Sequence, residues 1–393
     1  MCETGMVLSE LSYMIRHTKK FARKHRVMTP LAQFHASSYQ MPCPYGVVLV
    51  MSPWNYPFML TIDPLIDAIA AGNTVMVKPS AYSPYTSQII EEILTNVFPK
   101  EYVSVILGGR KENQALLEEK FDYIFFTGSP YVGHEVMSKA SVHLTPVTLE
   151  LGGKSPCIVD ETANIKLAAR RIVFGKYLNL GQTCVAPDYI YVHTSVKDKL
   201  IHEVIQEIKR QYQDLSSYGK IINEKHFDRI SKLLDPNKIV YGGKTNRETL
   251  KIEPTIMDHV SWDDAVMQEE IFGPIMPILT FTNFEDCINI IKEKPSPLAL
   301  YLFSSNKTRV DMVTHSVPYG GGCINDTIIH LATSNMPFGG VGNSGMGGYH
   351  GEEGFKTFTH YKSIVDKKTW LDLPIRYQPY SKLYDKLIHI FLR

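Results

Sequence analysis

The chain contains few cysteines, and their spacing suits neither pairing nor metal binding. Among its 393 residues there are six, at positions 2, 43, 157, 184, 287 and 323, with no CxxC pair and no repeated interval. A disulfide framework and a zinc site are therefore both unsupported, and the sequence predicts no metal. Free, reduced thiols indicate a cytoplasmic location.

An excess of charge of one sign and long apolar runs are also missing. The 41 basic and 40 acidic residues leave a formal net charge of +1, which gives no electrostatic reason to expect a nucleic acid partner. No apolar run approaches the roughly eighteen residues of a membrane-spanning helix, and charged residues near the N-terminus argue against a signal peptide. The sequence therefore predicts a soluble globular protein with a small-molecule partner.

Apolar strand patterns alternate with amphipathic helix patterns along the first part of the chain. Strands are expected at 45–51, 74–80, 102–109 and 121–129, each followed by a helix. Such alternation is typical of a parallel sheet covered by helices on both faces. A second α/β unit follows residue 150, so the predicted fold class is α/β with two doubly wound parallel sheets.

The two ends of the chain carry amphipathic helix patterns. Residues 6–22 predict one helix, which begins almost at the first residue. Near the other end, apolar residues fall on one helical stripe: Tyr380, Leu383, Tyr384, Leu387, Ile388, Phe391 and Leu392. This stripe either packs on a partner subunit or the protein's own body, or lies in a membrane interface.

Cys184 in "GQTCVAPDY" has no other cysteine nearby and is a candidate nucleophile. A buried core cysteine is the alternative, because most unpaired cysteines simply pack. Asn55 in "SPWNYP" could donate a side-chain N–H to an oxyanion, or could only form a turn. Glu150 ends an apolar strand in "TLELGGKSP", where burial would raise its pKa toward that of a general base. Its alternative role is to pair with Lys154.

Ligands of parallel sheets bind where the carboxyl ends of the strands open into loops. These loops contain Lys78 in "KPS" and the segment "GSPYVG", with Gly128, Ser129 and Gly133. That segment is either a tight structural turn or a pyrophosphate contact. The motif "QEEIFGP" at 268–274 offers two acids for ribose hydroxyls and an aromatic ring for a flat group.

Seven motifs occur in order: "PWNYP", "KPS", "FTGS", "LELGGKSP", "GQTCVAPDY", "EEIFGP" and "PFGGVGNSGMG". Together they resemble the aldehyde dehydrogenase superfamily, and "APDY", "LTPVTLELGGKSP" and "GNSGMGGYHG" look like its class 3 branch, which includes fatty aldehyde dehydrogenases. The resemblance runs from about residue 4 to about residue 380. Relatives carry about sixty further residues before the matching start, so a misplaced start, a fragment and a true short form all stay open.

The resemblance implies an NAD(P)-dependent oxidation of aldehydes, with medium- or long-chain aliphatic or aromatic substrates expected. Cys184 would attack the aldehyde carbon, Asn55 and the Cys184 N–H would hold the oxyanion, and Glu150 would activate water. Residues implied to bind the cofactor are Lys78, Gly128, Ser129, Gly133, Glu270 and Phe272. Implied domains are 1–148 for NAD(P), 149–345 for catalysis, and 346–393 for oligomerisation as a homodimer with an amphipathic tail.

One departure from the class 3 pattern concerns the cofactor. The pattern reads "KPSE", with the glutamate on the adenosine ribose, whereas this chain has Ala81. Because a carboxylate repels a 2'-phosphate, its loss predicts that this chain, which is expected to use NAD, tolerates NADP better than a relative that keeps the glutamate. Two alternatives stay open: a catalytically impaired nucleotide-binding or structural homologue, and an enzyme that passes the thioester to coenzyme A.

Overall fold

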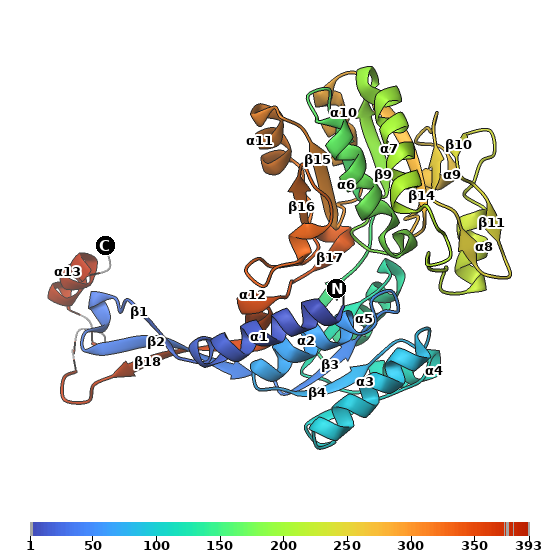
Figure 1. The fold of residues 1–393 in the computed structure, drawn as a ribbon. Helices are drawn as coiled ribbons and strands as arrows, with labels where there is room; N and C mark the ends of the chain where they lie inside the picture. The colour runs from blue at the N-terminus through green and yellow to red at the C-terminus, as the bar shows by residue number, and fades with distance from the viewer. Residues whose placement is uncertain (1–2, 373, 375–376, 380, 392–393) are drawn as a thin grey trace.

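The computed structural model describes residues 3–372, 374, 377–379 and 381–391 (Figure 1). A six-stranded sheet forms one half of the molecule, in the order β17-β7-β6-β3-β4-β5. Its strands are β3 (Val47–Met51), β4 (Thr74–Lys78), β5 (Val103–Val105), β6 (Tyr123–Thr127), β7 (Val147–Glu150) and β17 (Gly345–Met346). Only β17 is antiparallel to its neighbour. The strands are short apolar runs, as expected for a sheet buried on both faces.

The helices of this half alternate with the strands along the chain. They are α2 (Met59–Ala70), α3 (Pro84–Val97), α4 (Arg110–Glu118) and α5 (Pro130–Ser141). The predicted alternation is confirmed, although β5 is shorter than the apolar run at 102–109 suggested. Helix α1 (Thr4–Phe21) confirms the N-terminal prediction and packs along α2.

A seven-stranded sheet forms the other half, in the order β10-β13-β14-β9-β8-β15-β16. Its strands are β8 (Pro156–Val159), β9 (Tyr189–His193), β10 (Ile239–Tyr241), β13 (Thr255–Met257), β14 (Ile275–Phe281), β15 (Ala299–Phe303) and β16 (Gly321–Ile324). Its helices are α6 (Ile165–Tyr177), α7 (Lys197–Gln211), α8 (Glu224–Ser231), α9 (Ala265–Gln268), α10 (Phe284–Glu293) and α11 (Lys307–Ser316). Apart from the edge strand β10, the strands run parallel, so the predicted α/β class with two parallel sheets is confirmed.

A three-stranded antiparallel sheet extends away from both halves (Figure 1). It contains β1 (His25–Val27), β2 (Ala36–Pro44) and β18 (Thr359–Lys367). The segment expected to mediate oligomerisation, 346–393, supplies only β18, whereas residues before 45 supply the other two strands. The remaining elements are α12 (Gly351–Thr357), α13 (Lys382–Phe391), β11 (Thr245–Asn246), β12 (Lys251–Ile252), η1 (Leu31–Gln33), η2 (Leu178–Gly181), η3 (Thr194–Val196), η4 (Ile329–Leu331) and η5 (Gly342–Ser344).

Helix α13 carries part of the predicted C-terminal stripe. Tyr380 and Leu392 lie outside the described residues. Of the described side chains, Leu383 is exposed and Tyr384 is half-buried. No helix in the described part of the chain is long and apolar enough to cross a membrane.

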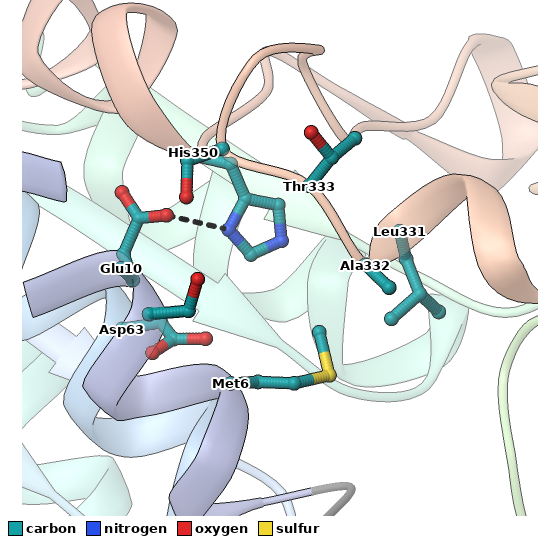
Figure 2. A pocket seen from close by; sticks show the side chains of 9 residues that line it. Met6, Glu10, Asp63, Leu331, Ala332, Thr333 and His350 are labelled. Atoms are coloured by element: carbon teal, nitrogen blue, oxygen red, sulfur yellow. Dashed lines mark ion pairs between the residues drawn. The ribbon is translucent and has the colours of Figure 1, made fainter. Parts of the chain in front are cut away.

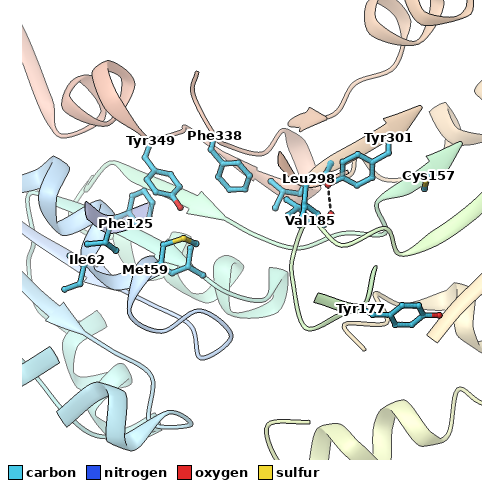
Figure 3. Packing of buried hydrophobic residues seen from close by; sticks show 14 of the residues in the cluster. Met59, Ile62, Phe125, Cys157, Tyr177, Val185, Leu298, Tyr301, Phe338 and Tyr349 are labelled. Atoms are coloured by element: carbon cyan, nitrogen blue, oxygen red, sulfur yellow. Dashed lines mark hydrogen bonds between the residues drawn. The ribbon is translucent and has the colours of Figure 1, made fainter. Parts of the chain in front are cut away.

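The largest buried cluster joins the two halves of the molecule (Figure 3). Phe125 of β6 packs edge-on against Tyr349, with ring centroids 5.1 Å apart, and lies 5.7 Å from Phe358. On the far side of the same cluster, Tyr301 of β15 donates a hydrogen bond to the carbonyl of Val185. The C-terminal part of the chain therefore returns across the first sheet and closes its core.

Replacement of Phe125 by alanine tests this closure. Phe125 is 1% exposed, so Phe125→Ala should lower the free energy of unfolding by about 3–5 kcal/mol through lost burial and an unfilled cavity. Urea unfolding followed by circular dichroism measures the change. Tyr85→Ala on α3, where the side chain is 82% exposed, is the control and should change the free energy by about 0.5 kcal/mol or less. Equal shifts for both variants would contradict the assignment.

Candidate active site

A cleft of about 1100 Å³ opens where the strands of the six-stranded sheet end. Its walls come from the loops after β3, β4, β6 and β7, and from the segments around Cys184 and residues 267–272. The predicted site residues that line it are Asn55, Lys78, Gly128, Ser129, Glu150, Cys184, Glu270 and Phe272. Gly133 does not line it. The structure thus brings together residues that are more than two hundred positions apart in the sequence.

A strained turn places Cys184 at the cleft. After α6 ends, Asn179, Leu180 and Gly181 adopt positive φ angles of 49°, 55° and 70°. A side chain at Gly181 would overlap the carbonyl of Gly273, so only glycine fits there. Non-glycine residues in this region cost energy and are held only where the surroundings enforce them. The turn therefore fixes the direction in which the chain enters Cys184.

The electrostatics around Cys184 oppose ionisation of its thiol. Desolvation by burial raises the pKa of Cys184 to about 12, and the charges of Glu270 and Glu150 add to the effect. Hydrogen bonds from the backbone N–H groups of Cys184 and Val185 act in the opposite direction. An electropositive setting, which usually activates a cysteine, is not what the structure shows. The thiol is instead neutral and half-buried in this state.

Glu150 lies at the end of β7 and is 3% exposed. Within the described residues neither of its carboxylate oxygens has a hydrogen-bond partner. Burial raises the pKa of Glu150 well above its ordinary value, as the sequence predicted. The alternative pairing with Lys154 is wrong, because the Lys154 ammonium lies 2.5 Å from Asp188 and donates to the carbonyls of Val266 and Glu269.

Asn55 is tied to the turn before Cys184. Its Nδ2 donates to the carbonyl of Gln182 at 3.1 Å, and Nδ2 of Asn179 donates to the Asn55 carbonyl at 2.9 Å. An asparagine amide has two N–H donors, so one is still available when the first is engaged. Asn55 is therefore both a structural link and a possible donor to a ligand in the cleft.

Glu270 and Phe272 form the opposite wall. Burial and the nearby Asp188 raise the pKa of Glu270 to about 8, although Lys154, Arg229 and the Gly153 N–H favour its charged form. A Cβ at Gly152 would overlap the Glu270 carboxylate, so the carboxylate reaches the turn that follows Glu150. The ring of Phe272 meets Trp54 edge-on with centroids 5.4 Å apart. The carboxyl groups of Glu150 and Glu270 and the rings of Trp54 and Phe272 thus line the same cleft.

The remaining predicted residues fit a dinucleotide. Lys78 is 2% exposed, and its ammonium donates to the carbonyls of Gly108 and Pro79 at 2.7 and 2.9 Å. Ser129 caps α5, whose N-terminus faces the cleft and suits a phosphate. A Cβ at Gly128 would lie 2.5 Å from the Phe126 ring, so this turn needs glycine. The volume of the cleft also suits a ligand of this size.

Gly133 lies in a helix and not in a turn, and its role in the structure is to allow close packing. It lies inside α5, and a Cβ there would come within 2.7 Å of Leu151. Gly133 therefore allows α5 to approach the strand-end segment closely, in support of the loop that holds Ser129. This is a packing role beside the phosphate-facing helix end.

Sequence reasoning missed a buried lysine behind the site. Lys176 is fully buried, and burial lowers its pKa to about 8, with Asp188 and Glu270 opposing that change. The sequence offered no signal beyond a lysine within a helix pattern, where lysine is usually exposed. No group of His, Cys, Asp and Glu among the described residues could hold a metal ion.

Comparison with known proteins defines the class. The family described as "Aldehyde dehydrogenase family" matches residues 2–364. A 4,4'-diaponeurosporen-aldehyde dehydrogenase of Staphylococcus aureus is 48% identical, covering 100% of this chain and 86% of that protein. Aldehyde dehydrogenase family 3 member A2 of Rattus norvegicus is 43% identical over 93% of this chain and 76% of that protein.

Solved structures agree with the sequence comparison. A substrate-bound state of Staphylococcus aureus AldH superposes with a TM-score of 0.97 at 48% identity, covering all of this chain and 86% of that one. A Mycobacterium tuberculosis aldehyde dehydrogenase complexed with NAD+ gives a TM-score of 0.83 at 29% identity, over 91% and 76% of the two chains. The chain belongs to the aldehyde dehydrogenase family, in its class 3 branch. It is an oxidoreductase that oxidises aldehydes with NAD(P), and the expectation of an impaired homologue is not favoured.

The reactivity of the thiol checks the electrostatics of the site. With a pKa near 12, Cys184 in the unliganded chain should react with iodoacetamide at neutral pH at least about a hundredfold more slowly than an ordinary cysteine. Glu270→Gln removes the negative charge that Glu270 carries above its pKa of about 8, so labelling should become faster at alkaline pH and change little at neutral pH. Mass spectrometry of the Cys184 peptide measures the rate, with exposed Glu248→Gln as the control. Faster labelling of Cys184 in Glu248→Gln but not in Glu270→Gln would contradict the role of the Glu270 charge in raising the pKa of the thiol.

Proposed function

We propose that Cys184 is the nucleophile, Asn55 the oxyanion donor and Glu150 the general base of this aldehyde oxidation. The observation that supports the proposal best is the meeting of a thiol, an unpartnered buried carboxylate and an amide in one cleft. Packing alone gives no reason to bury Glu150 without a hydrogen bond, because such burial is costly. A function in the cleft accounts for it.

The chemistry follows from the positions of these groups. The thiol of Cys184 gives its proton to solvent water in the cleft, and its sulfur forms a bond to the aldehyde carbon as the C=O π bond breaks. The carbonyl oxygen becomes an oxyanion that accepts hydrogen bonds from the Asn55 amide and the Cys184 N–H. NAD(P), when bound, would supply an acceptor for the hydride of this carbon, and loss of the hydride would leave a thioester to Cys184. We propose that Lys78, Gly128, Ser129, Glu270 and Phe272 hold the cofactor, and that Gly133 supports them by letting α5 pack closely on Leu151.

The second half of the reaction releases the acid. Glu150 takes a proton from a water molecule, whose oxygen attacks the thioester carbon. The C–S bond breaks, Cys184 leaves as thiolate, and the product is a carboxylate. A raised pKa of Glu150 makes it a stronger base when it is ionised, which suits this step. This use of water argues against transfer of the acyl group to coenzyme A.

Substitutions separate the two halves. Cys184→Ala should reduce turnover to background, because no thioester can form. Glu150→Gln should retain one burst of reduced cofactor and then slow the steady state by about 10²–10⁴-fold. Absorbance at 340 nm and the mass of the acylated chain measure both effects. Glu248→Gln should behave like the unmodified chain. Loss of the burst in Glu150→Gln would instead mean that Glu150 acts before hydride transfer.

We propose that the chain uses NADP as well as NAD. Ala81 lines the cleft beside Arg110, and its Cβ lies 4.0 Å from the Cβ position of Gly109. No carboxylate at position 81 repels a 2'-phosphate there, and a similar mouse protein is named "dimeric NADP-preferring". A preference for NAD larger than about a hundredfold, or about 2.7 kcal/mol, would contradict the proposal.

Restoring the acid tests the role of position 81. Ala81→Glu should raise the ratio of kcat/KM for NAD to that for NADP by about ten- to a hundredfold, because the new charge repels the 2'-phosphate. The ratio is measured with one aldehyde under saturating conditions. Ala22→Glu, an exposed position at the end of α1, is the control. If the ratio of kcat/KM for NAD to that for NADP is unchanged in Ala81→Glu, position 81 does not discriminate between the two cofactors at the adenosine ribose.

We propose medium- or long-chain aliphatic or aromatic aldehydes as substrates. Apolar and aromatic side chains, among them Trp54, Leu60 and Phe272, line the cleft. The staphylococcal relative is named a 4,4'-diaponeurosporen-aldehyde dehydrogenase, so its named substrate is also an aldehyde. We also propose that residues 1–148 bind the cofactor, that residues 149–345 carry out catalysis, and that residues 346–393 mediate assembly.

We further propose a cytoplasmic homodimer with its tail at a membrane interface. The three-stranded sheet reaches away from the body and offers a surface for a second copy (Figure 1). On α13, Leu383 and Ile390 are exposed and suit an apolar contact. Recovery of the full chain, and not of a chain ending at 373, with liposomes supports membrane contact, whereas equal recovery excludes it.

A further inference from the structure

Two neighbouring loops form the corner of the catalytic cleft beyond Lys78. Because β4 and β5 pair in parallel, the loops that follow these strands meet at the same edge of the sheet. The Lys78 ammonium joins the two loops, since it donates to the carbonyls of Pro79 and Gly108 at 2.9 and 2.7 Å. A Cβ at Gly109 would lie 4.0 Å from the Cβ of Ala81. The residue before α4 therefore lies beside the position where the class 3 pattern has a glutamate.

Arg110 follows directly as the first residue of α4. Its side chain is exposed and lines the cleft. Its guanidinium forms no ion pair or hydrogen bond with another residue in the described part of the chain. Lys78, by contrast, is 2% exposed and is already engaged by two carbonyls. Of these two cations, Arg110 is therefore the one that is free to bind a group in the cleft.

This corner of the cleft carries positive charge. The lining residues that the two loops and α4 supply include Lys78 and Arg110 but no aspartate or glutamate. Glu112 of α4 is not among them, and its carboxylate accepts the Gly109 N–H at 2.6 Å. The acids that line the cleft come from other segments: Glu135, Glu150, Glu269 and Glu270. An anionic group of a ligand is therefore favoured at this corner over the rest of the cleft.

Alanine at position 81 keeps the guanidinium available. A glutamate there would place a carboxylate beside Gly109, within reach of Arg110, and the two side chains would pair. An alanine carries no charge and leaves the arginine to a ligand. The loss of the glutamate thus has two effects at this corner, because it removes a repulsion and it leaves a cation without a partner.

A second cavity offers no alternative site for an anion. It measures about 30 Å³ and lies among α1, α2 and the turn at His350, where the carboxylates of Glu10 and Asp63 border it (Figure 2). None of the described residues that line it is a lysine or an arginine, and it shares no lining residue with the cleft. Because like charges repel, a phosphate is expected at Arg110 and not in this cavity.

We propose that Arg110 binds the 2'-phosphate of NADP and is the residue that favours this cofactor. The inference rests on the proposed function, since it concerns one of the two cofactors proposed for the cleft. A guanidinium donates two parallel N–H bonds to a phosphate, and it stays charged at every physiological pH. NAD has a hydroxyl in place of this phosphate and gains no charge-assisted bond from the arginine. Arg110 therefore acts on the choice of cofactor and not on the chemistry at Cys184.

The test uses two fragments that differ only in the 2'-phosphate. 2',5'-ADP and 5'-AMP share the adenosine and the 5'-phosphate, and calorimetry measures their affinities for the full chain. The chain should bind 2',5'-ADP at least about tenfold more tightly than 5'-AMP. Arg110→Gln should lose this preference, while its affinity for 5'-AMP changes by less than about threefold. Neither fragment contains nicotinamide, so the result does not depend on turnover.

Two further variants serve as controls. Lys111→Gln removes the same charge from the next residue of α4, which is exposed and does not line the cleft, and it should keep the preference. Arg110→Lys keeps the charge but loses the paired donors, so it should keep only part of the preference. Loss of the preference in Lys111→Gln as well would mean a general effect of charge and would overturn the proposal.

Other results also overturn the assignment. Equal affinity for the two fragments in the unmodified chain, no binding of 2',5'-ADP, or an unchanged preference in Arg110→Gln would make Arg110 an ordinary solvated surface residue. An equal loss of affinity for both fragments in Arg110→Gln would assign the arginine to the 5'-phosphate or the adenine.

A kinetic comparison connects the fragment result with the reaction. With one aldehyde, the ratio of kcat/KM for NADP to that for NAD should fall by about ten- to a hundredfold in Arg110→Gln. An unchanged ratio contradicts the proposal. If the chain oxidises no aldehyde with either cofactor, the proposed function fails, whereas the calorimetric result still decides whether Arg110 binds the 2'-phosphate.

Discussion

The structure depends on two hydrogen bonds that join its halves at the active site. The Asn55 amide donates to the Gln182 carbonyl, and the Asn179 amide donates to the Asn55 carbonyl. They connect the loop after β3 to the left-handed turn that leads into Cys184. Because the turn has positive φ angles at Asn179 and Leu180, it would relax without such support. Asn55 and Cys184, the proposed oxyanion donor and nucleophile, are therefore positioned by the same contact.

Around this contact the cleft is lined by three groups that can lose a proton, namely Glu150, Cys184 and Glu270. Desolvation raises the pKa of each group, and the charges of Glu270 and Glu150 raise the pKa of Cys184 further. A positive charge or a further hydrogen-bond donor brought into the cleft would favour the thiolate of Cys184 without moving the protein. The arrangement therefore favours the neutral thiol in the cleft as it stands.

The sequence predicts the elements of this fold well, because buried parallel strands are short apolar runs and their ends must open into a common edge. The same rule assigns Asn55, Glu150 and Lys78 to one edge of the sheet from the sequence alone. It could not show that Asn55 binds Gln182, 127 positions away, or that Glu10 binds Gly351, 341 positions away. Those contacts depend on how the halves pack. The burial of Lys176 has the same origin, since a helix pattern does not reveal which face a second sheet will cover.

Helix α2 anchors the loop that carries Asn55. The loop precedes the first residue of the helix, Met59, and the Tyr56 hydroxyl in it shares a hydrogen bond with Thr183. Thr61 shares a hydrogen bond with Ser52, which fixes the start of the helix to the end of β3. Since a helix does not stretch, the loop between β3 and α2 keeps Asn55 at one position beside the turn before Cys184.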